Sequence, residues 1–100
     1  ITTIDDNINI KIDNLKELDL SNNQLTDISG LNQMESINYL NLSNNVNDSN
    51  EPSLTDIIPL DPSNGLDLGT VVLKGVPVTD GNTTVVNNLE DSGVEVIGYN

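Results

Sequence analysis

A nine-residue pattern occurs twice in this chain, and the second copy begins 22 residues after the first. Both copies, residues 15–23 and 37–45, have the form Leu/Ile-x-x-Leu-x-Leu-x-x-Asn, and both end in Leu-Ser-Asn-Asn. A period in the twenties with this spacing is typical of a solenoid, in which repeats stack because none buries its apolar side chains alone. The repeat therefore predicts the fold more directly than the function.

The centre of each copy alternates apolar and polar residues. Alternation turns Leu18 and Leu20 inward and Asp19 outward, which predicts a short strand with one buried side. Asn23 and Asn45 follow their strands by three residues, where the chain turns and buried backbone groups need partners. Because an amide side chain both donates and accepts, we predict that these two asparagines form a stacked ladder.

A third copy of the pattern spans residues 68–78, although Val76 occupies the asparagine position and interrupts the ladder. This copy comes nine residues later than the period requires. Seven of the surplus residues fall within the polar stretch 46–53, whose turn-forming composition predicts an inserted loop. Beyond that stretch, Leu-Thr-Asp-Ile at residues 54–57 repeats the same four residues at 25–28.

Both ends of the chain depart from the pattern, as terminal coils exposed on one side must. Residues 1–14 are interpreted as a partial first coil. Near the other end, apolar residues recur at helical spacing, with Asn82 or Thr83 as the candidate N-cap and Gly93 where a helix commonly ends. Alternation resumes at residues 94–96 and predicts a last strand, so residues 80–100 are predicted to form a C-terminal capping repeat.

These motifs resemble leucine-rich repeat proteins with 22-residue repeats, as in bacterial internalin-like surface proteins and regulators of protein phosphatase 1. The resemblance covers roughly residues 10–100 and implies the C-terminal part of an array. It also implies one domain, residues 1–100, folded as a right-handed α/β solenoid of about four coils. Such a solenoid has a short parallel sheet on its concave face, a 3₁₀ or irregular convex side and a short helix near the C-terminus. The chain departs from the family at Val76, at Asn47 and in its inserted loop.

We expect the outward strand face to bind another protein. Alternation assigns eight residues to that face: Glu17, Asp19, Ser21, Tyr39, Asn41, Ser43, Val72 and Lys74. Tyr39 is the best candidate anchor because aromatic residues are enriched among binding hot spots. The alternative, which the sequence supports equally, is that Tyr39 only covers the aliphatic side chains of the sheet. A sheet of about four strands is only about 15–20 Å across, which is small for a standard interface of roughly 800 Å² per partner.

That small sheet leaves several functions open. The resemblance implies a bacterial adhesion-type protein that is secreted or held at the cell surface. A structural spacer or cap that presents a neighbouring domain is one alternative, and a cytosolic scaffold similar to the phosphatase regulators is another. High Asn, Asp and Thr content together with internalin-like repeats favours the extracellular location over the cytoplasm, and the start at Ile1 favours a processed or excised chain.

Charge and composition exclude some classes of function. Sixteen acidic and 3 basic residues give a net charge of −13, which makes nucleic acid and anionic membranes poor partners. No apolar run approaches the roughly 20 residues that span a bilayer. Without histidine or cysteine the usual nucleophilic triads and most zinc sites are excluded, so we expect neither an enzyme nor a cofactor. The oligomeric state stays open.

Calcium is the one metal that the sequence leaves open. Segments 5–9 and 45–49 alternate oxygen-bearing residues, and Asp56 stands 11 positions after Asn45, the offset of the last ligand in an EF-hand loop. Neither segment has the glycine at position 6 or the glutamate at position 12 of that loop. Solvated acidic loops explain both segments without a metal.

Overall fold

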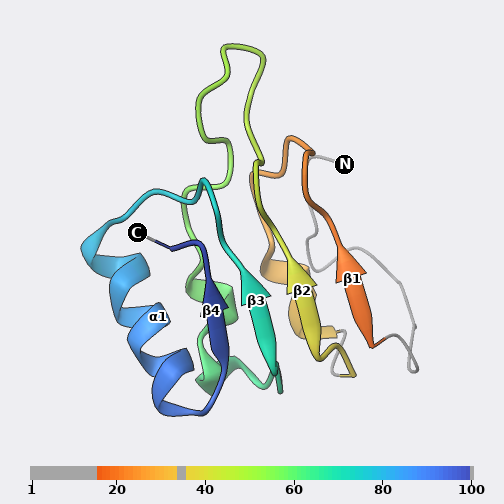
Figure 1. The fold of residues 1–100 in the computed structure, drawn as a ribbon, viewed down its shortest axis with the longest axis vertical. Helices are drawn as coiled ribbons and strands as arrows, with labels where there is room; N and C mark the ends of the chain where they lie inside the picture. The colour runs from red at the N-terminus through yellow and green to blue at the C-terminus, as the bar shows by residue number, and fades with distance from the viewer. Residues whose placement is uncertain (1–15, 34–35, 100) are drawn as a thin grey trace.

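Four short strands form one parallel sheet in the computed structural model, which describes residues 16–33 and 36–99. The strands are β1 (Glu17–Asp19), β2 (Tyr39–Asn41), β3 (Thr70–Val72) and β4 (Glu95–Ile97), and they lie side by side in sequence order (Figure 1). Parallel neighbours need a return segment between them, so each strand and its return form one coil. The predicted partial coil at residues 1–14 lies outside the described residues.

The register of the sheet aligns equivalent positions of the repeats. The central residues of the four strands pair in the order Leu18, Leu40, Val71 and Val96. The ladder continues past the strands, because the Leu20 N–H donates to the Asn41 carbonyl at 2.8 Å and the Leu42 N–H to the Val72 carbonyl at 2.9 Å. This register confirms that the third copy of the pattern begins near residue 68.

The return segments form a second row behind the sheet. It contains the 3₁₀ helices η1 (Ser29–Gln33), η2 (Ile58–Leu60) and η3 (Pro62–Asn64) and the helix α1 (Asp80–Asp91) (Figure 1). Two repeated aspartates begin the first two helices in the same way. Asp27 accepts the backbone N–H of Ser29 and Asp56 accepts that of Ile58, both at 2.8 Å. The repeated Leu-Thr-Asp-Ile therefore builds equivalent turns in successive coils.

Aliphatic side chains from both rows fill the space between them. Leu25, Leu42, Leu54 and Leu73 are among those with at most 1 % of their surface exposed. Burying such a side chain contributes about 1.5–3 kcal/mol, so the shared interior supplies most of what holds the coils together. Val76, in the asparagine position of the third copy, is buried in the same core.

The third copy leaves the template after Val76. Val78, the last apolar residue of that copy, is 53 % exposed, whereas its counterpart Leu25 is fully buried. The chain instead turns into α1, whose N-cap is Thr79: its hydroxyl accepts the backbone N–H of Asn82 at 3.1 Å. The candidate N-caps Asn82 and Thr83 are therefore wrong. Gly93, with φ of 89°, follows the helix as predicted.

Residues 46–53, for which the sequence predicts an inserted loop, form a hairpin that extends beyond the carboxyl ends of the strands (Figure 1). Val46 and Pro52 make an antiparallel bridge, and the Asn47 N–H donates to the Glu51 carbonyl at 2.8 Å. The side chain of Asn47 also accepts the backbone N–H groups of Ser49 and Glu51. The hairpin is thus closed by its own hydrogen bonds.

Candidate functional site

The strand residues that point away from the core form two rows across the sheet. The row at the amino ends of the strands is Glu17, Tyr39, Thr70 and Glu95. The row at the carboxyl ends is Asp19, Asn41, Val72 and Ile97. We call these eight residues the open sheet face. At the usual strand spacing each row spans about 14 Å from β1 to β4.

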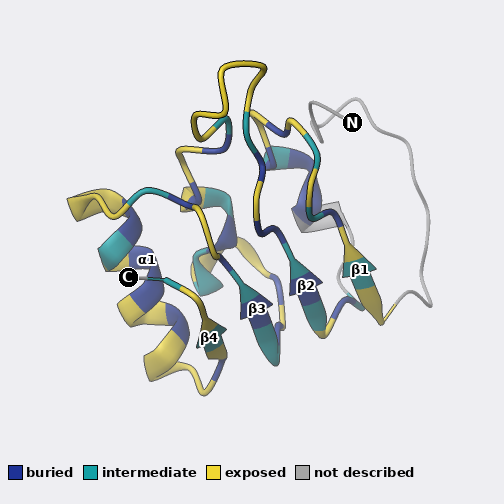
Figure 2. Ribbon diagram, turned by 45° about the horizontal axis from the view of Figure 1, so that its top comes forward, coloured by how far each residue is buried: buried dark blue, intermediate teal, exposed yellow. Residues whose placement is uncertain are grey.

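Exposure varies across the open sheet face. Both face residues of β1 and both of β4 are exposed, whereas those of β2 and β3 are half-buried (Figure 2). Asp19 lies beside Asn41 and Asn41 beside Val72, as the repeat spacing predicts. Ile97 completes this row and is 43 % exposed, next to the half-buried Val72. The face therefore changes from acidic on β1 to apolar between β3 and β4.

Sequence reasoning missed three residues of the open sheet face, namely Thr70, Glu95 and Ile97. The alternation at residues 94–96 predicted a strand there, but nothing in the repeat pattern showed that this strand pairs with β3. The register of β3 with β4 supplies that information. The signal that would have found Glu95 and Ile97 is alignment of the last strand with the repeat. Thr70 takes in the third copy the position that Glu17 and Tyr39 take in the first two, so the repeat spacing alone would have found it.

Four predicted face residues hold the turns that end β1 and β2. Oδ1 of Asp19 accepts the backbone N–H of Ser21 at 2.9 Å and also the Ser21 hydroxyl. Oδ1 of Asn41 makes the same two contacts with Ser43, at 3.0 Å and 2.7 Å. Aspartate and asparagine are thus interchangeable in this turn, and they differ there in charge.

The two turns differ in the charge of the accepting side chain and in the burial of the serine. The hydroxyl and backbone N–H of Ser21 lower the pKa of the Asp19 carboxyl, because both hydrogen bonds stabilise the carboxylate. Ser43 is buried, so the prediction that it offers surface to a partner is wrong. Ser21, in the coil of β1, is half-buried.

Tyr39 and Lys74, the remaining predicted residues with distinctive chemistry, lie in different parts of the surface. Tyr39 is half-buried in the middle of the amino-end row, between Glu17 and Thr70. Lys74 is exposed just beyond β3, outside the two rows. A side chain at Gly98 would come within 3.0 Å of the Lys74 Cβ, so the glycine leaves room for the lysine beside the end of β4.

The predicted asparagine ladder positions lie inside the turns that follow the strands. Nδ2 of Asn45 donates to the carbonyl oxygens of Leu20 at 3.2 Å and Leu42 at 2.8 Å. Its Oδ1 accepts the backbone N–H of Leu25 at 3.0 Å. Nδ2 of Asn23 donates to the same Leu20 carbonyl at 3.0 Å. Asn45 is therefore a direct link between two coils.

The linking role of a second asparagine, Asn82, escaped sequence reasoning, which offered it only as a candidate N-cap. It is buried, and its Nδ2 donates to the carbonyl oxygens of Thr55 at 2.9 Å and Pro77 at 3.0 Å. Its Oδ1 accepts the backbone N–H of Ile57 at 3.1 Å. Asn82 lies outside the repeated pattern, in the first turn of α1, so only the folded chain shows that it joins the capping helix to the preceding coil.

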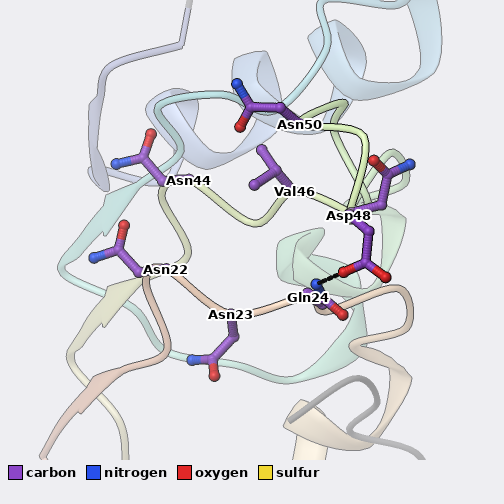
Figure 3. Close-up of a pocket in the computed structure, with 8 residues that line it drawn as sticks. Asn22, Asn23, Gln24, Asn44, Val46, Asp48 and Asn50 are labelled. Atoms are coloured by element: carbon purple, nitrogen blue, oxygen red, sulfur yellow. Dashed lines mark hydrogen bonds between the residues drawn. The ribbon is translucent and has the colours of Figure 1, made fainter.

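Amide side chains surround a shallow hollow of about 480 Å³ beside the carboxyl ends of β1 and β2 (Figure 3). Its lining is Asn22, Asn23, Gln24, Asn44, Val46, Asn47, Asp48 and Asn50. Nε2 of Gln24 donates to Oδ1 of Asp48 at 2.8 Å, which joins the first turn to the hairpin. Asn22, Asn44 and Asn50 have φ near 60°, a conformation that asparagine adopts more readily than most residues. The hollow thus lies between the turns that follow β1 and β2 and the hairpin.

The repeats, the in-register sheet and the linking asparagines point to one family. A family model for leucine-rich repeats, in two copies, matches residues 13–62. This chain belongs to the leucine-rich repeat family. Leucine-rich repeats generally mediate protein–protein interactions and are typically non-catalytic. A comparison with curated proteins found no match, and neither did one with solved structures.

The calcium hypothesis for this leucine-rich repeat chain concerns two segments. Residues 5–9 lie outside the described part of the chain. In residues 45–49, the side-chain oxygens of Asn45 and Asn47 already accept backbone N–H groups. Residues 16–33 and 36–99 contain no group of three or more acidic side chains placed to hold a metal ion. No helix among these residues has the length and apolar character to cross a membrane.

Proposed function

We propose that this leucine-rich repeat protein binds another protein through the open sheet face, as the concave side of a right-handed solenoid, and catalyses no reaction. The observation that carries this proposal is the register-aligned row from Asp19 to Ile97. The row presents charged, polar and apolar side chains at fixed spacing. The half-buried Val72 beside the exposed Ile97 forms an apolar contact area rather than a single scattered residue.

The structure of the turns supports binding at this face. Ser21 fixes the Asp19 carboxylate and Ser43 fixes the Asn41 amide, so both side chains are ordered before a partner arrives. Ordering a flexible side chain at an interface costs about 0.5–1.5 kcal/mol, and prior ordering avoids that cost. The face is therefore preorganised for recognition.

The area of the sheet limits the strength of binding. Three strand spacings by three residues give roughly 14 Å by 10 Å, well below the roughly 800 Å² that a standard interface buries on each partner. We infer that the hairpin at residues 46–53 and its amide-lined hollow supply further contacts. The same small area favours one other function, that of a spacer presenting a neighbouring domain.

We also propose that the chain belongs to a bacterial adhesion-type protein that is secreted or held at the cell surface. Its resemblance to internalin-like repeats supports this proposal. The net charge of −13 and the absence of cysteine are compatible with it. Localisation of the full-length protein by cell fractionation tests the proposal, and recovery only from the cytoplasm would contradict it.

A capture experiment with matched variants tests binding at the open sheet face. The face variant combines Tyr39→Ala with Ile97→Ser, and the control combines Asn87→Ala with Glu90→Ala on the exposed side of α1. We expect the unaltered chain and the control to capture the same protein, and the face variant to capture about ten-fold less, equivalent to about 1.4 kcal/mol. Equal capture by all three would reject the proposal and favour the spacer. Thermal unfolding by circular dichroism checks that each variant folds.

A further inference from the structure

We propose that the partner of the open sheet face is a cationic protein segment that places a basic side chain over β1 and an apolar side chain over β3 and β4. This inference rests on the proposed function and adds the chemistry of the partner. It follows from the unequal distribution of charged and apolar side chains along the two rows.

The charged end lies on β1. Glu17 and Asp19 are both exposed, and both belong to the open sheet face. Oδ1 of Asp19 is occupied by Ser21, whereas Oδ2 accepts no hydrogen bond from the described residues and is available to a partner. A charge-assisted hydrogen bond from an arginine or lysine is the strongest contact that such an oxygen makes. The two neighbouring carboxylates therefore favour an arginine or lysine side chain of the partner at this end.

The apolar end lies where β3 and β4 pair. Val72 and Ile97 are register partners, and Ile97 leaves 43 % of its surface exposed. An aliphatic side chain of the partner would cover both residues and remove this surface from water. In contrast, the carboxylates of β1 have no apolar neighbour in their own strand pointing to the same side.

Lys74 gives the segment a direction. It is exposed beyond β3, and its Cβ lies against Gly98 at the end of β4. An arginine or lysine side chain of the partner would be repelled by Lys74 and attracted to β1. The open sheet face has two carboxylates on β1 and one, that of Glu95, on β4. The net charge of −13 attracts a cationic segment at long range and disfavours both nucleic acid and a second copy of this chain.

The spacing of the two ends sets the length of the segment. Asp19 and Ile97 lie in one row, three strand spacings apart, which corresponds to about 14 Å. An extended chain advances about 3.3 Å per residue, so about four residues cover this distance. The structure therefore favours an arginine or lysine and a leucine-like residue four positions apart in an extended segment.

The repeat itself provides matched variants. In the coil of β2, Asn41 makes the same turn contacts as Asp19 makes in the coil of β1, so Asp19→Asn removes the charge while keeping the turn. Conversely, Asn41→Asp adds a carboxylate in the same row. The probe is a ten-residue synthetic peptide of serine and threonine with one arginine and one leucine four positions apart. Its controls replace the arginine with glutamate or the leucine with serine.

Backbone amide chemical shifts of the isotope-labelled chain report where each peptide binds. We expect the arginine peptide to shift amides in β1 to β4. Asp19→Asn should weaken this binding by about five-fold and Ile97→Ser by about ten-fold. Asn41→Asp should strengthen it by up to about five-fold.

Other results distinguish failure of this inference from failure of the proposed function. Equal binding of the glutamate peptide at the same face overturns the cationic partner and supports the face as a protein-binding surface. Peptide binding confined to α1 or the hairpin overturns both proposals. Absence of shifts with every peptide at millimolar concentration overturns the cationic partner, while the capture experiment still decides the proposed function. If the amide shifts instead change with protein concentration when no peptide is present, the face binds a second copy of the chain. That result also overturns the cationic partner.

Discussion

Asn45 and Leu20 belong to neighbouring coils and are joined directly, because Nδ2 of Asn45 donates to the carbonyl oxygen of Leu20 at 3.2 Å. The same side chain satisfies a carbonyl of its own coil at Leu42 and the backbone N–H of Leu25. One buried amide thus serves three backbone groups. Coil stacking in this protein depends on such polar links as well as on aliphatic packing.

Replacement of Asn45 by alanine should lower the free energy of unfolding by about 2–4 kcal/mol, because it leaves buried backbone groups without partners. Urea unfolding measures this change. The matched control is Asn87→Ala on exposed α1 surface, where alanine is the better helix former and stability should stay equal or rise slightly. Equal urea midpoints for the two variants would show that Asn45 does not hold the coils together.

Gly98 and Gly65 provide a second matched pair, since both have φ between 80° and 100°. A side chain at Gly98 would lie 3.0–3.2 Å from the Cβ, backbone N and Cα of Lys74, whereas at Gly65 nothing lies within 4 Å. Both alanine variants should lose about 1–2 kcal/mol from the left-handed backbone, and Gly98→Ala should lose about 1–3 kcal/mol more from crowding. Thermal unfolding compares them. A smaller loss for Gly98→Ala than for Gly65→Ala would contradict the close approach of β4 to Lys74.

The sequence predicted the repeated part of the fold because each repeat contains its own evidence. Alternation and spacing identified the inward leucines, and the turn after each strand identified Asn23 and Asn45. The repeat no longer specifies burial where it ends: Val78 fits the pattern of the third copy, but it is 53 % exposed because the chain there turns into α1. Ser43 was assigned to the surface, although it is buried.

The candidate site was only partly predictable for a related reason. Alternation specifies which side of a strand a residue occupies, but it does not specify which strands pair. Glu95 and Ile97 join the open sheet face only through the pairing of β4 with β3. Asn82 links α1 to Thr55 through contacts between segments that share no sequence pattern. Such features depend on tertiary packing, which no local sequence pattern specifies.

Acid should weaken the contact between α1 and the segment that carries Asp61. The Asn88 side chain and the Ser63 backbone N–H and hydroxyl lower the pKa of the Asp61 carboxyl, because they stabilise its charged form. A carboxyl whose pKa is lower in the folded state stabilises the fold above its ordinary pKa of 3.8, and this contribution is lost as pH falls through the lowered value. Thermal unfolding between pH 5 and pH 2 measures the loss.

Asp61→Asn should therefore make the melting temperature less sensitive to acid than in the unaltered chain. The control is Asp67→Asn, which removes the same formal charge at an exposed position with no hydrogen bond to the described residues. That variant should keep the acid sensitivity of the unaltered chain. If Asp61→Asn responds to acid like the unaltered chain, the 2.7 Å hydrogen bond from Asn88 to the Asp61 carboxylate contributes nothing to stability.

Disulfide cross-linking tests the stacking of the coils most directly, because the chain contains no cysteine of its own. Asp19 and Asn41 are register partners about 4.8 Å apart, within the Cα separation that a disulfide bridges, whereas Asp19 and Val72 are about 10 Å apart. On mild oxidation, Asp19→Cys combined with Asn41→Cys should form an intramolecular disulfide. Asp19→Cys combined with Val72→Cys should remain reduced. Cross-linking of the second pair as readily as the first would contradict the in-register coils on which the open sheet face depends.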